Sequence, residues 1–372
     1  MRAALITLAG MEDIASQEIE EKIGKNGKTN PSFVFFDVKN KDELYSFVYT
    51  SQSARRVIIV SAMIEHKNEK SEAIVSKLIK EMNEKILKEE VKDSFYITCV
   101  KENYTDDHTS PDIASSLAET IQKISGAKPT LQEPNTQLVL FITRTHAVFG
   151  IDIAGFDLAK REYKIFTGSF ALKAPLAYAM VRLSGFDEKK TLLDPLCGAG
   201  IIPIEAGFFA TKKSVHYFEK KKFLGNYLYL FDKEDKKIKK SKSVIWAIGD
   251  SFNHIAWTKK NAKIAGIQDA LHYSRTEVDY LDAKFEEKTM DCIVSYPPVL
   301  SKRANEKKMR KLYEQLFDEA NFLLKKKGRL VLLAKHPEHY LVQAERVKLS
   351  LKEQRTVWQG QEELFLVVFE KP

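Results

Sequence analysis

Short apolar segments alternate with longer amphipathic ones from about residue 170 to the end of the chain. Strand-like segments occur at 191–196, 243–249, 271–280, 291–297 and 328–334, and helix-like segments separate most of them. This alternation predicts a parallel, doubly wound sheet with helices on its faces. The last two apolar segments, 350–360 and 362–371, have no helix between them, so we expect an antiparallel hairpin at the edge of that sheet.

The first half of the chain has shorter elements. Residues 1–65 combine apolar runs with one amphipathic segment, which indicates a small mixed α/β unit. Residues 66–156 predict a second α/β unit with a helix over 110–126. Ser110 is a good N-cap for that helix and Gly126 a good C-cap. The sequence therefore predicts an α/β multi-domain protein.

Composition narrows the class of partner and compartment. The 372 residues include 59 Lys and Arg against 51 Asp and Glu, a net charge of +8 that favours a polyanionic partner; the alternative is a solvated lysine-rich surface. The three cysteines show no CxxC spacing, which indicates neither a disulfide framework nor a zinc site. No apolar run approaches the roughly 20 residues of a membrane helix. We expect a cytoplasmic protein.

The stretch LLDPLCGAGIIPIEA, residues 192–206, reads as a strand, an acid, a small-residue turn and a helix. Gly198 and Gly200 would let the backbone approach a ligand closely, and the helix after them offers free N–H groups at the positive end of its dipole. A carboxylate or phosphate binds well there, and Asp194 can accept a hydrogen bond from an ammonium group. Cys197 lies inside the turn without a nearby histidine, so we expect it to fill space rather than act as a nucleophile.

S-adenosylmethionine suits this turn better than a dinucleotide does. A dinucleotide fingerprint needs a third glycine, and Pro203 occupies that place. S-adenosylmethionine carries a carboxylate and an ammonium instead of phosphates. Acids also follow the next two predicted strands: Asp250 is expected to bind the ribose hydroxyls and Asp279 the adenine amino group, with Tyr280 or Leu281 against the ring. Three acids at one edge of a doubly wound sheet predict a site for this cofactor.

Seven sequence motifs follow one another along the chain: SPDIASSLAETIQ, VFGIDIAGFDLAKREYKIFTG, LKAPLAYAMVRLSG, LLDPLCGAGIIPIEAG, KKNAKIAG, a Pro-Pro pair and LYEQLFDEANFLLKKKGRLVLL. Their order and spacing resemble the THUMP-domain RNA methyltransferases with a Rossmann-like catalytic domain, especially the tRNA guanine-N2 methyltransferases. The resemblance covers nearly the whole chain. It implies an N-terminal ferredoxin-like domain over 1–65, a THUMP domain over 66–156 that binds the acceptor end of tRNA, a linker over 157–169 and a catalytic domain over 170–372.

The same resemblance extends the set of cofactor-binding residues. It implies that Lys173, Pro195 and Cys197 contact S-adenosylmethionine together with the acids and glycines already named. By the family's spacing the ribose-binding acid would fall on Gly249, so Asp250 must serve with an offset of one residue.

The target-base motif departs from the family pattern. The family has Asn or Asp, Pro, Pro or Leu, an aromatic residue and Gly, whereas the chain has Tyr296, Pro297, Pro298, Val299 and then Leu. An exocyclic amine needs an acceptor for its N–H so that its lone pair faces the methyl group, and a tyrosine hydroxyl lies farther from the backbone than an Asn oxygen. Tyr296 can instead stack on a flipped base, which then forms hydrogen bonds to the Pro297 carbonyl and Ser295.

Three functions therefore stay open. The first is methyl transfer to guanine N2 in tRNA, and the second is a tRNA-binding protein whose methyltransferase domain is a relic. The third is a ribosomal RNA methyltransferase, because the lysine-rich and aromatic insertion 212–243 is also similar to one in that group. This insertion reads either as an exposed arm that stacks on bases or as an excursion whose aromatics pack on the protein. The basic run 307–311 is expected near the mouth of the site.

Overall fold

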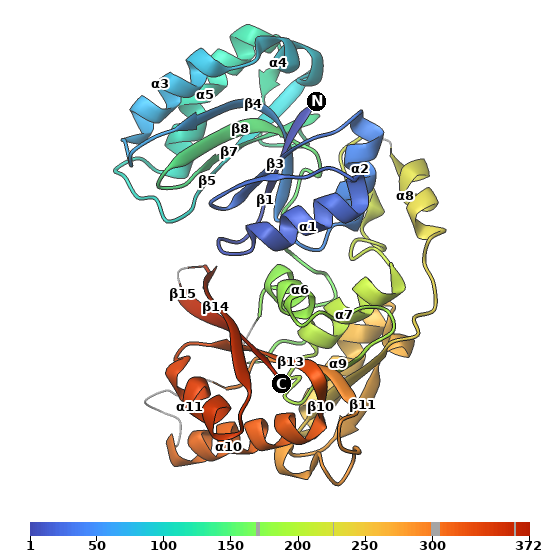
Figure 1. Cartoon of the computed structure of the whole chain (residues 1–372). Helices are drawn as coiled ribbons and strands as arrows, with labels where there is room; N and C mark the ends of the chain where they lie inside the picture. The colour runs from blue at the N-terminus through green and yellow to red at the C-terminus, as the bar shows by residue number, and fades with distance from the viewer. Residues whose placement is uncertain (169–171, 226, 299–305, 361) are drawn as a thin grey trace. The chain divides into compact units, whose positions relative to one another are not determined.

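The computed structural model describes residues 1–168, 172–225, 227–298, 306–360 and 362–372 (Figure 1). These residues form two compact units. The N-terminal unit comprises residues 1–7, 15–158 and 218–232, and the C-terminal unit comprises residues 8–14, 159–217 and 233–372. Residues 8–14 come early in the chain but belong to the C-terminal unit, and residues 218–232 come late but belong to the N-terminal unit. Neither unit is therefore one continuous stretch of chain.

The N-terminal unit contains a sheet with strand order β2-β3-β1-β4-β8-β7-β5-β6. Helices α3, α4 and α5 lie together on one face of the part of the sheet formed by β4, β8, β7 and β5 (Figure 1). The strands are β1 (Arg2–Ile6), β2 (Lys28–Asn30), β3 (Phe33–Asp37), β4 (Arg56–Glu65), β5 (Ser94–Lys101), β6 (Lys128–Pro129), β7 (Thr136–Ile142) and β8 (His146–Asp152). The helices are α1 (Glu12–Ile23), α2 (Lys41–Thr50), α3 (Ser71–Glu81), α4 (Glu84–Glu90) and α5 (Ser110–Ser125).

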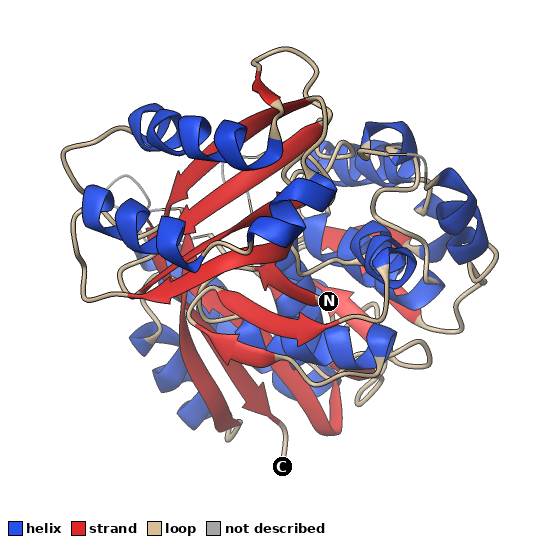
Figure 2. Cartoon of the chain, turned by 90° about the horizontal axis from the view of Figure 1, so that it is seen from above, coloured by secondary structure: helices blue, strands red, loops and turns tan. Residues whose placement is uncertain are grey.

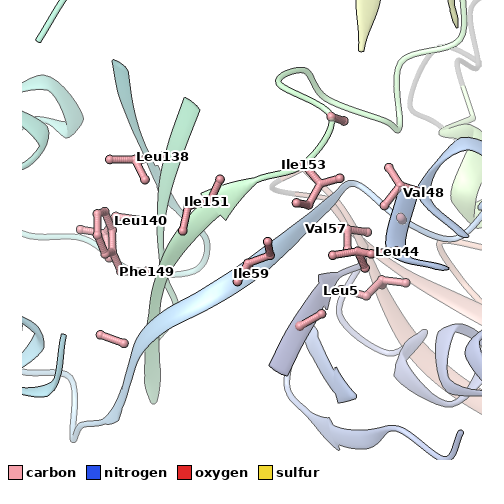
Figure 3. Close-up of a cluster of buried hydrophobic side chains, with 14 of the residues drawn as sticks. Leu5, Leu44, Val48, Val57, Ile59, Leu138, Leu140, Phe149, Ile151 and Ile153 are labelled. Carbon is pink, nitrogen blue, oxygen red and sulfur yellow. The ribbon is translucent and has the colours of Figure 1, made fainter. Parts of the chain in front are cut away.

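The boundary expected near residue 65 falls inside this sheet. Strand β4 pairs with β1 on one side and with β8 on the other, so the sequences 1–65 and 66–156 share one continuous sheet. Their apolar side chains also share one core, which Figure 3 shows for Leu5, Leu44, Val57, Ile59, Leu138, Phe149 and Ile151. The chain passes from one unit to the other at Leu158, within the predicted linker.

Helix α5 confirms the expected helix, with one correction at its start. The N-cap is Thr109, one residue before the predicted Ser110. The Thr109 hydroxyl accepts from the Asp112 N–H, and the Asp112 carboxylate accepts from the Thr109 N–H, which forms a capping box. Gly126 adopts the left-handed conformation at the C-cap, as expected.

The C-terminal unit contains a sheet with strand order β11-β10-β9-β12-β13-β15-β14, in which β15 is antiparallel to both of its neighbours and the other pairs are parallel. This arrangement confirms the doubly wound parallel sheet with an antiparallel hairpin at its edge. The strands are β9 (Thr191–Asp194), β10 (Val244–Gly249), β11 (His272–Arg275), β12 (Met290–Ser295), β13 (Leu324–Ala334), β14 (Ser350–Gln359) and β15 (Glu362–Glu370).

Helices cover both faces of this sheet, and Figure 2 shows them coloured apart from the strands. Apolar residues of α6, α7 and α9 pack in one core, and those of α10 and α11 pack in another. The pattern of residues 338–346 did not indicate the helix α11 that forms there. The helices of this unit are α6 (Ala174–Leu183), α7 (Ile201–Thr211), α9 (Phe252–Ala265), α10 (Glu306–Leu323) and α11 (Glu338–Arg346). Helix α8 (Leu228–Asp235) lies in the insertion, and its residues up to Asp232 belong to the N-terminal unit.

Residues 8–14 belong to the C-terminal unit because they dock on β14. The Arg355 guanidinium donates to both Asp13 carboxylate oxygens, at 2.6 and 2.9 Å, and to the Gly10 carbonyl at 3.0 Å. Gly10 has φ +86°, and a Cβ there would lie 2.3 Å from the Thr356 carbonyl oxygen. Only glycine therefore allows the chain to approach β14 so closely.

The insertion 212–243 contributes residues 218–232 to the N-terminal unit. Tyr227 stacks on Tyr45 with ring centroids 3.4 Å apart, and Phe231 stacks on Tyr49 at 4.4 Å. The interpretation of the insertion as an exposed stacking arm is wrong for these aromatic residues, because they pack in a core. Phe218 and Tyr229 remain 65% and 58% exposed.

Candidate active site

A cavity of about 650 Å³ lies in the C-terminal unit at the carboxyl ends of β9, β10 and β12, which is where doubly wound sheets bind ligands. Its volume is in the range of sites for small molecules and cofactors. Six parts of the chain line it: the segment before α6, the glycine-rich turn, the three segments that follow β10, β11 and β12, and the first half of α10. The predicted residues on its wall are Asp194, Cys197, Gly198, Asp250, Asp279, Tyr296 and Pro298.

The glycine-rich turn uses its two glycines differently. Both have positive φ, +53° at Gly198 and +83° at Gly200. Gly198 lines the cavity, and a Cβ built there meets no atom within 4 Å, so this glycine leaves the cavity open. A Cβ at Gly200 would lie 2.5 Å from the Thr258 side chain, so Gly200 is required for the packing of α7 against α9. The turn therefore combines ligand access with close helix packing.

Asp194, at the end of β9, is the buried acid of the site. Its side chain accepts hydrogen bonds from the Ser295 hydroxyl at 2.7 Å and from the Leu196 N–H at 3.2 Å. Burial raises the pKa of Asp194 to about 7, and these two hydrogen bonds offset only part of that rise. A cationic group in the cavity would favour the ionised form, so the carboxyl suits the ammonium of S-adenosylmethionine.

The other two predicted acids are exposed on the same wall. Asp250 follows β10 and lies 2.9 Å from His254 Nδ1, and Asp279 accepts from Gln315 Nε2 at 2.9 Å. Asp279 does not end a strand as expected: β11 ends at Arg275, and Asp279 lies in the 3₁₀ turn Val278–Tyr280. The carboxylates are nevertheless placed on the cavity as the order of the strands predicted.

Four predicted cofactor residues are not among those that line the cavity within the described part of the chain: Gly200, whose packing role is given above, and Lys173, Pro195 and Tyr280. Tyr280 is 60% exposed, Pro195 is buried, and the Lys173 backbone N–H donates to Gln359 Oε1 at 2.8 Å. Leu281, the alternative to Tyr280, lies in the core beneath α10. Val278 occupies the cavity wall instead, and it supplies an apolar surface for a planar ring.

Cys197 lines the cavity but is buried, and burial raises the pKa of its thiol far above its usual range. A protonated thiol that lies 3.5 Å from the Thr258 hydroxyl packs the turn rather than attacking a substrate. Among the described residues, no group of three or more His, Cys, Asp or Glu side chains is arranged to hold a metal ion.

The target-base motif divides between the cavity and the protein interior. Ser295 is fully buried, its hydroxyl donates to Asp194, and it is not among the described residues that line the cavity, so this arrangement does not support the expected contact with a base. Tyr296 and Pro298 line the cavity, whereas Pro297 is buried. Burial raises the pKa of Tyr296 to about 12, so its hydroxyl is neutral at physiological pH. Val299 and the leucine after it lie outside the described residues.

Helix α10 forms another part of the cavity wall. Lys308 and Lys311 from the predicted basic run line the cavity, whereas Arg310 pairs with Glu306 at 2.7 Å on its own helix. The Tyr313 hydroxyl donates to the Pro298 carbonyl at 2.6 Å and fixes the end of the proline pair. Other residues of the wall were not predicted from the sequence, among them Lys164, His254, Trp257, Glu277 and Gln315.

Comparison with known proteins places this geometry in context. Residues 161–362 match a protein family described as RMKL-like, methyltransferase domain. The chain is 26% identical over 376 residues to the tRNA (guanine(6)-N2)-methyltransferase of Methanocaldococcus jannaschii, covering 95% of this chain and 96% of that protein. The crystal structure of TrmN from Thermus thermophilus superposes with a TM-score of 0.71 at 20% identity, over 100% of this chain and 99% of that one.

A second solved structure, that of SMU.472 complexed with SAH, gives a TM-score of 0.77 at 18% identity and covers 100% of this chain and 98% of that one. Both superpositions extend over the whole chain, so the fold is shared from the first element to the last. No helix among the described residues has the length and apolar character needed to cross a membrane.

Proposed function

The chain belongs to the RMKL-like methyltransferase domain family, and on that premise we propose that it transfers the methyl group of S-adenosylmethionine to N2 of a guanine in tRNA. The observation that carries the proposal is the single cavity on which Asp194, Asp250 and Asp279 meet beside the glycine-rich turn. The full-length similarity to a tRNA guanine-N2 methyltransferase supports this choice of substrate.

The residues of the cavity fit the cofactor group by group. Asp194 would hold the ammonium, Asp250 the ribose hydroxyls and Asp279 the adenine amino group, with Val278 beside the ring. When bound, S-adenosylmethionine supplies a methyl group on a sulfonium, which is already activated for transfer. The protein then has to position the acceptor amine and exclude water, and positioning of this kind accounts for a large share of catalysis.

Tyr296 is proposed to orient the target base. The guanine amine must lose its N–H hydrogen bonds to water and find acceptors in the site, so that its lone pair faces the methyl group. The neutral Tyr296 hydroxyl can accept one such hydrogen bond, and the half-buried ring offers a surface for stacking. Transfer of the methyl group would break its bond to sulfur and leave a neutral thioether, and the one excess proton on the guanine nitrogen would pass to solvent.

The tRNA is proposed to bind through both units. We assign the acceptor end to the THUMP sequence, residues 66–156, and the region around the target base to Lys308 and Lys311 on the cavity wall. Lysines of this kind contribute to affinity through phosphate contacts, which makes binding depend on salt. The cytoplasm is the compartment that suits such a substrate.

Incubation of the purified protein with methyl-labelled S-adenosylmethionine and unmodified tRNA is expected to yield N2-methylguanosine, detected by mass spectrometry of nucleosides. Ribosomal RNA serves as the competing substrate, and transfer to it alone would exclude tRNA. Binding of both S-adenosylmethionine and tRNA without any transfer would contradict the enzyme and support a tRNA-binding protein with a relic domain.

Replacing Tyr296 with Ala is expected to lower kcat about 100-fold, because a misplaced acceptor amine costs about that much. Tyr296→Phe separates stacking from hydrogen bonding: loss of one hydrogen bond lowers kcat about 10-fold. Tyr296→Asn restores the residue of the family motif and is expected to retain or raise activity. The KM for S-adenosylmethionine should stay unchanged in all three variants, and full activity of Tyr296→Ala would show that the side chain does not contact the base.

A further inference from the structure

Lys164 lines the cavity but has no part in the function described so far. It lies in the segment before α6, in which Thr167 and Gly168 also line the cavity. Its ammonium donates to the Leu172 carbonyl at 2.7 Å. A lysine on a cofactor cavity needs an explanation, because Lys side chains usually extend into solvent.

Interactions on both sides of Lys164 hold this segment against the C-terminal unit. Before it, the Arg161 guanidinium pairs with Glu205 of α7 at 3.0 Å, and the Tyr163 hydroxyl donates to the same carboxylate at 2.8 Å. After it, the Asn261 side chain of α9 accepts from the Phe166 N–H at 3.1 Å. Lys164 therefore projects from a fixed backbone.

Asn261 also ties this segment to the glycine-rich turn. Its Nδ2 donates to the Phe166 carbonyl at 2.8 Å and to the Ala199 carbonyl at 2.9 Å. Ala199 is next to Gly198, and both line the cavity. The wall that carries Lys164 is thus joined by one buried side chain to the wall that follows Asp194.

The charged groups near Lys164 favour the binding of an anion beside it. Burial lowers the pKa of Lys164, and the nearby positive charges of Arg161 and Lys173 lower it further. Glu205 acts in the opposite direction, but it already pairs with Arg161. On the same cavity Asp194 has its pKa raised by burial. The pKa of Lys164 is thus lowered and that of Asp194 raised, so the charged form of each group is disfavoured. A ligand with one negative and one positive charge would stabilise both charged forms.

We infer that Lys164 binds the carboxylate of the cofactor's amino-acid moiety while Asp194 binds its ammonium, so that the pair recognises an α-amino acid zwitterion. This inference rests on the proposed function, since it assumes that the cavity holds S-adenosylmethionine. From the sequence alone, the carboxylate is expected to bind the N-terminus of α7, whereas this inference assigns it to Lys164.

The test is a thermodynamic cycle between the protein and its ligand. Binding of S-adenosylmethionine and of decarboxylated S-adenosylmethionine is measured by calorimetry for the wild type and for Lys164→Met, which keeps the unbranched side chain and removes the charge. For the wild type we expect the decarboxylated ligand to bind about 10- to 100-fold more weakly, the range for a hydrogen bond to a charged group. Lys164→Met should lose the same factor for S-adenosylmethionine and show no further loss for the decarboxylated ligand.

Two controls keep the result interpretable. Lys160→Met removes an exposed lysine of the same segment and should bind both ligands as the wild type does. 5′-Methylthioadenosine lacks the amino-acid moiety, so unchanged binding of it by Lys164→Met shows that the cavity is intact. Lys164→Arg, which keeps the positive charge, should retain most of the affinity.

Each outcome has one meaning. Equal affinity of the wild type and Lys164→Met for S-adenosylmethionine would overturn the inference and leave the proposed function standing. So would an equal loss from decarboxylation in both proteins, because the carboxylate would then be bound elsewhere. A wild type that binds none of the three ligands would overturn the proposed function and this inference with it.

Discussion

Replacing Glu205 with Ala is expected to lower the free energy of unfolding by about 3–5 kcal/mol, the largest change we expect from a single side chain outside the cavity. The Glu205 and Arg161 side chains are both fully buried, and their ion pair is bidentate, with N–O distances of 3.0 and 3.4 Å. Removal of the carboxylate leaves the Arg161 charge buried without its partner. Urea unfolding of the full chain measures the change.

Three further variants separate the ion pair from simple loss of volume. Tyr163→Phe removes only the 2.8 Å hydrogen bond to Glu205 and should cost about 1 kcal/mol. The double variant Arg161→Met with Glu205→Leu replaces the pair by apolar groups and should recover much of the loss. Glu306→Ala breaks the exposed pair with Arg310 and should change stability by less than about 1 kcal/mol. A Glu205→Ala protein as stable as Glu306→Ala would contradict the role of the buried pair.

Replacing Asp194 with Asn is expected to weaken cofactor binding at least 100-fold and, at the same time, to stabilise the ligand-free protein. Asn keeps an acceptor oxygen for Ser295 and Leu196 but cannot offset an ammonium charge. In the ligand-free protein the pKa of Asp194 is raised to about 7, so ionisation above that pH opposes folding. At pH 8 the variant should gain on the order of 3 kcal/mol of unfolding free energy.

The pH dependence of the unfolding free energy shows whether the gain in Asp194→Asn comes from the ionisation of Asp194. Because the folded-state pKa of Asp194 lies above its unfolded value, the stabilising contribution of the neutral acid is fully present below about pH 4 and is lost as pH rises through 7. The advantage of Asp194→Asn should therefore shrink as pH falls from 8 to 4. Near pH 7 about half of the Asp194 side chains are protonated, so binding of S-adenosylmethionine should release about half a proton per site from Asp194 in the wild type, a release that the variant lacks. Calorimetry in buffers of different ionisation enthalpy measures that difference.

Asp250→Asn is the matched control, because Asp250 is an exposed acid on the same cavity. Solvent screens its charge, so its replacement should change stability by less than about 0.5 kcal/mol at any of these pH values. Equal stability gains in the two variants would show that the effect reflects net charge rather than burial of Asp194.

Local patterns in the sequence were sufficient to predict most of the C-terminal sheet. Alternation of apolar and amphipathic segments identifies elements that each bury one face, and the order of the acids after successive strands predicted which of them would share a cavity. Helix α2 was overlooked although its start was visible: the Asn40 side chain accepts from the Glu43 N–H at 2.9 Å, a capping pattern that can be read from the sequence. Helix α11 has only 9 residues, and its buried residues are Tyr340 and Ala344, so few apolar positions mark it in the sequence.

The features that were missed or misassigned depend on contacts between distant parts of the chain. Lys164 reaches the cavity wall because Glu205 and Asn261 fix the segment around it, and these partners are far away in the sequence. Ser295 resembled a base-binding residue because it precedes the proline pair, yet its neighbour in space is Asp194. Local composition cannot reveal such partners, whereas the pairing of β12 with β9 brings them together.

The exchanged segments affect the order in which the protein can fold during synthesis. Tyr49 is buried beneath Phe231, which the ribosome adds long after the rest of the N-terminal unit, whose main body ends at Leu158. At ordinary translation speeds the interval is roughly 4 to 15 s. During that time a nascent chain would expose the apolar surface around Tyr49, a surface of the kind that chaperones bind. Residues 218–232, in the middle of the insertion, therefore complete the N-terminal unit.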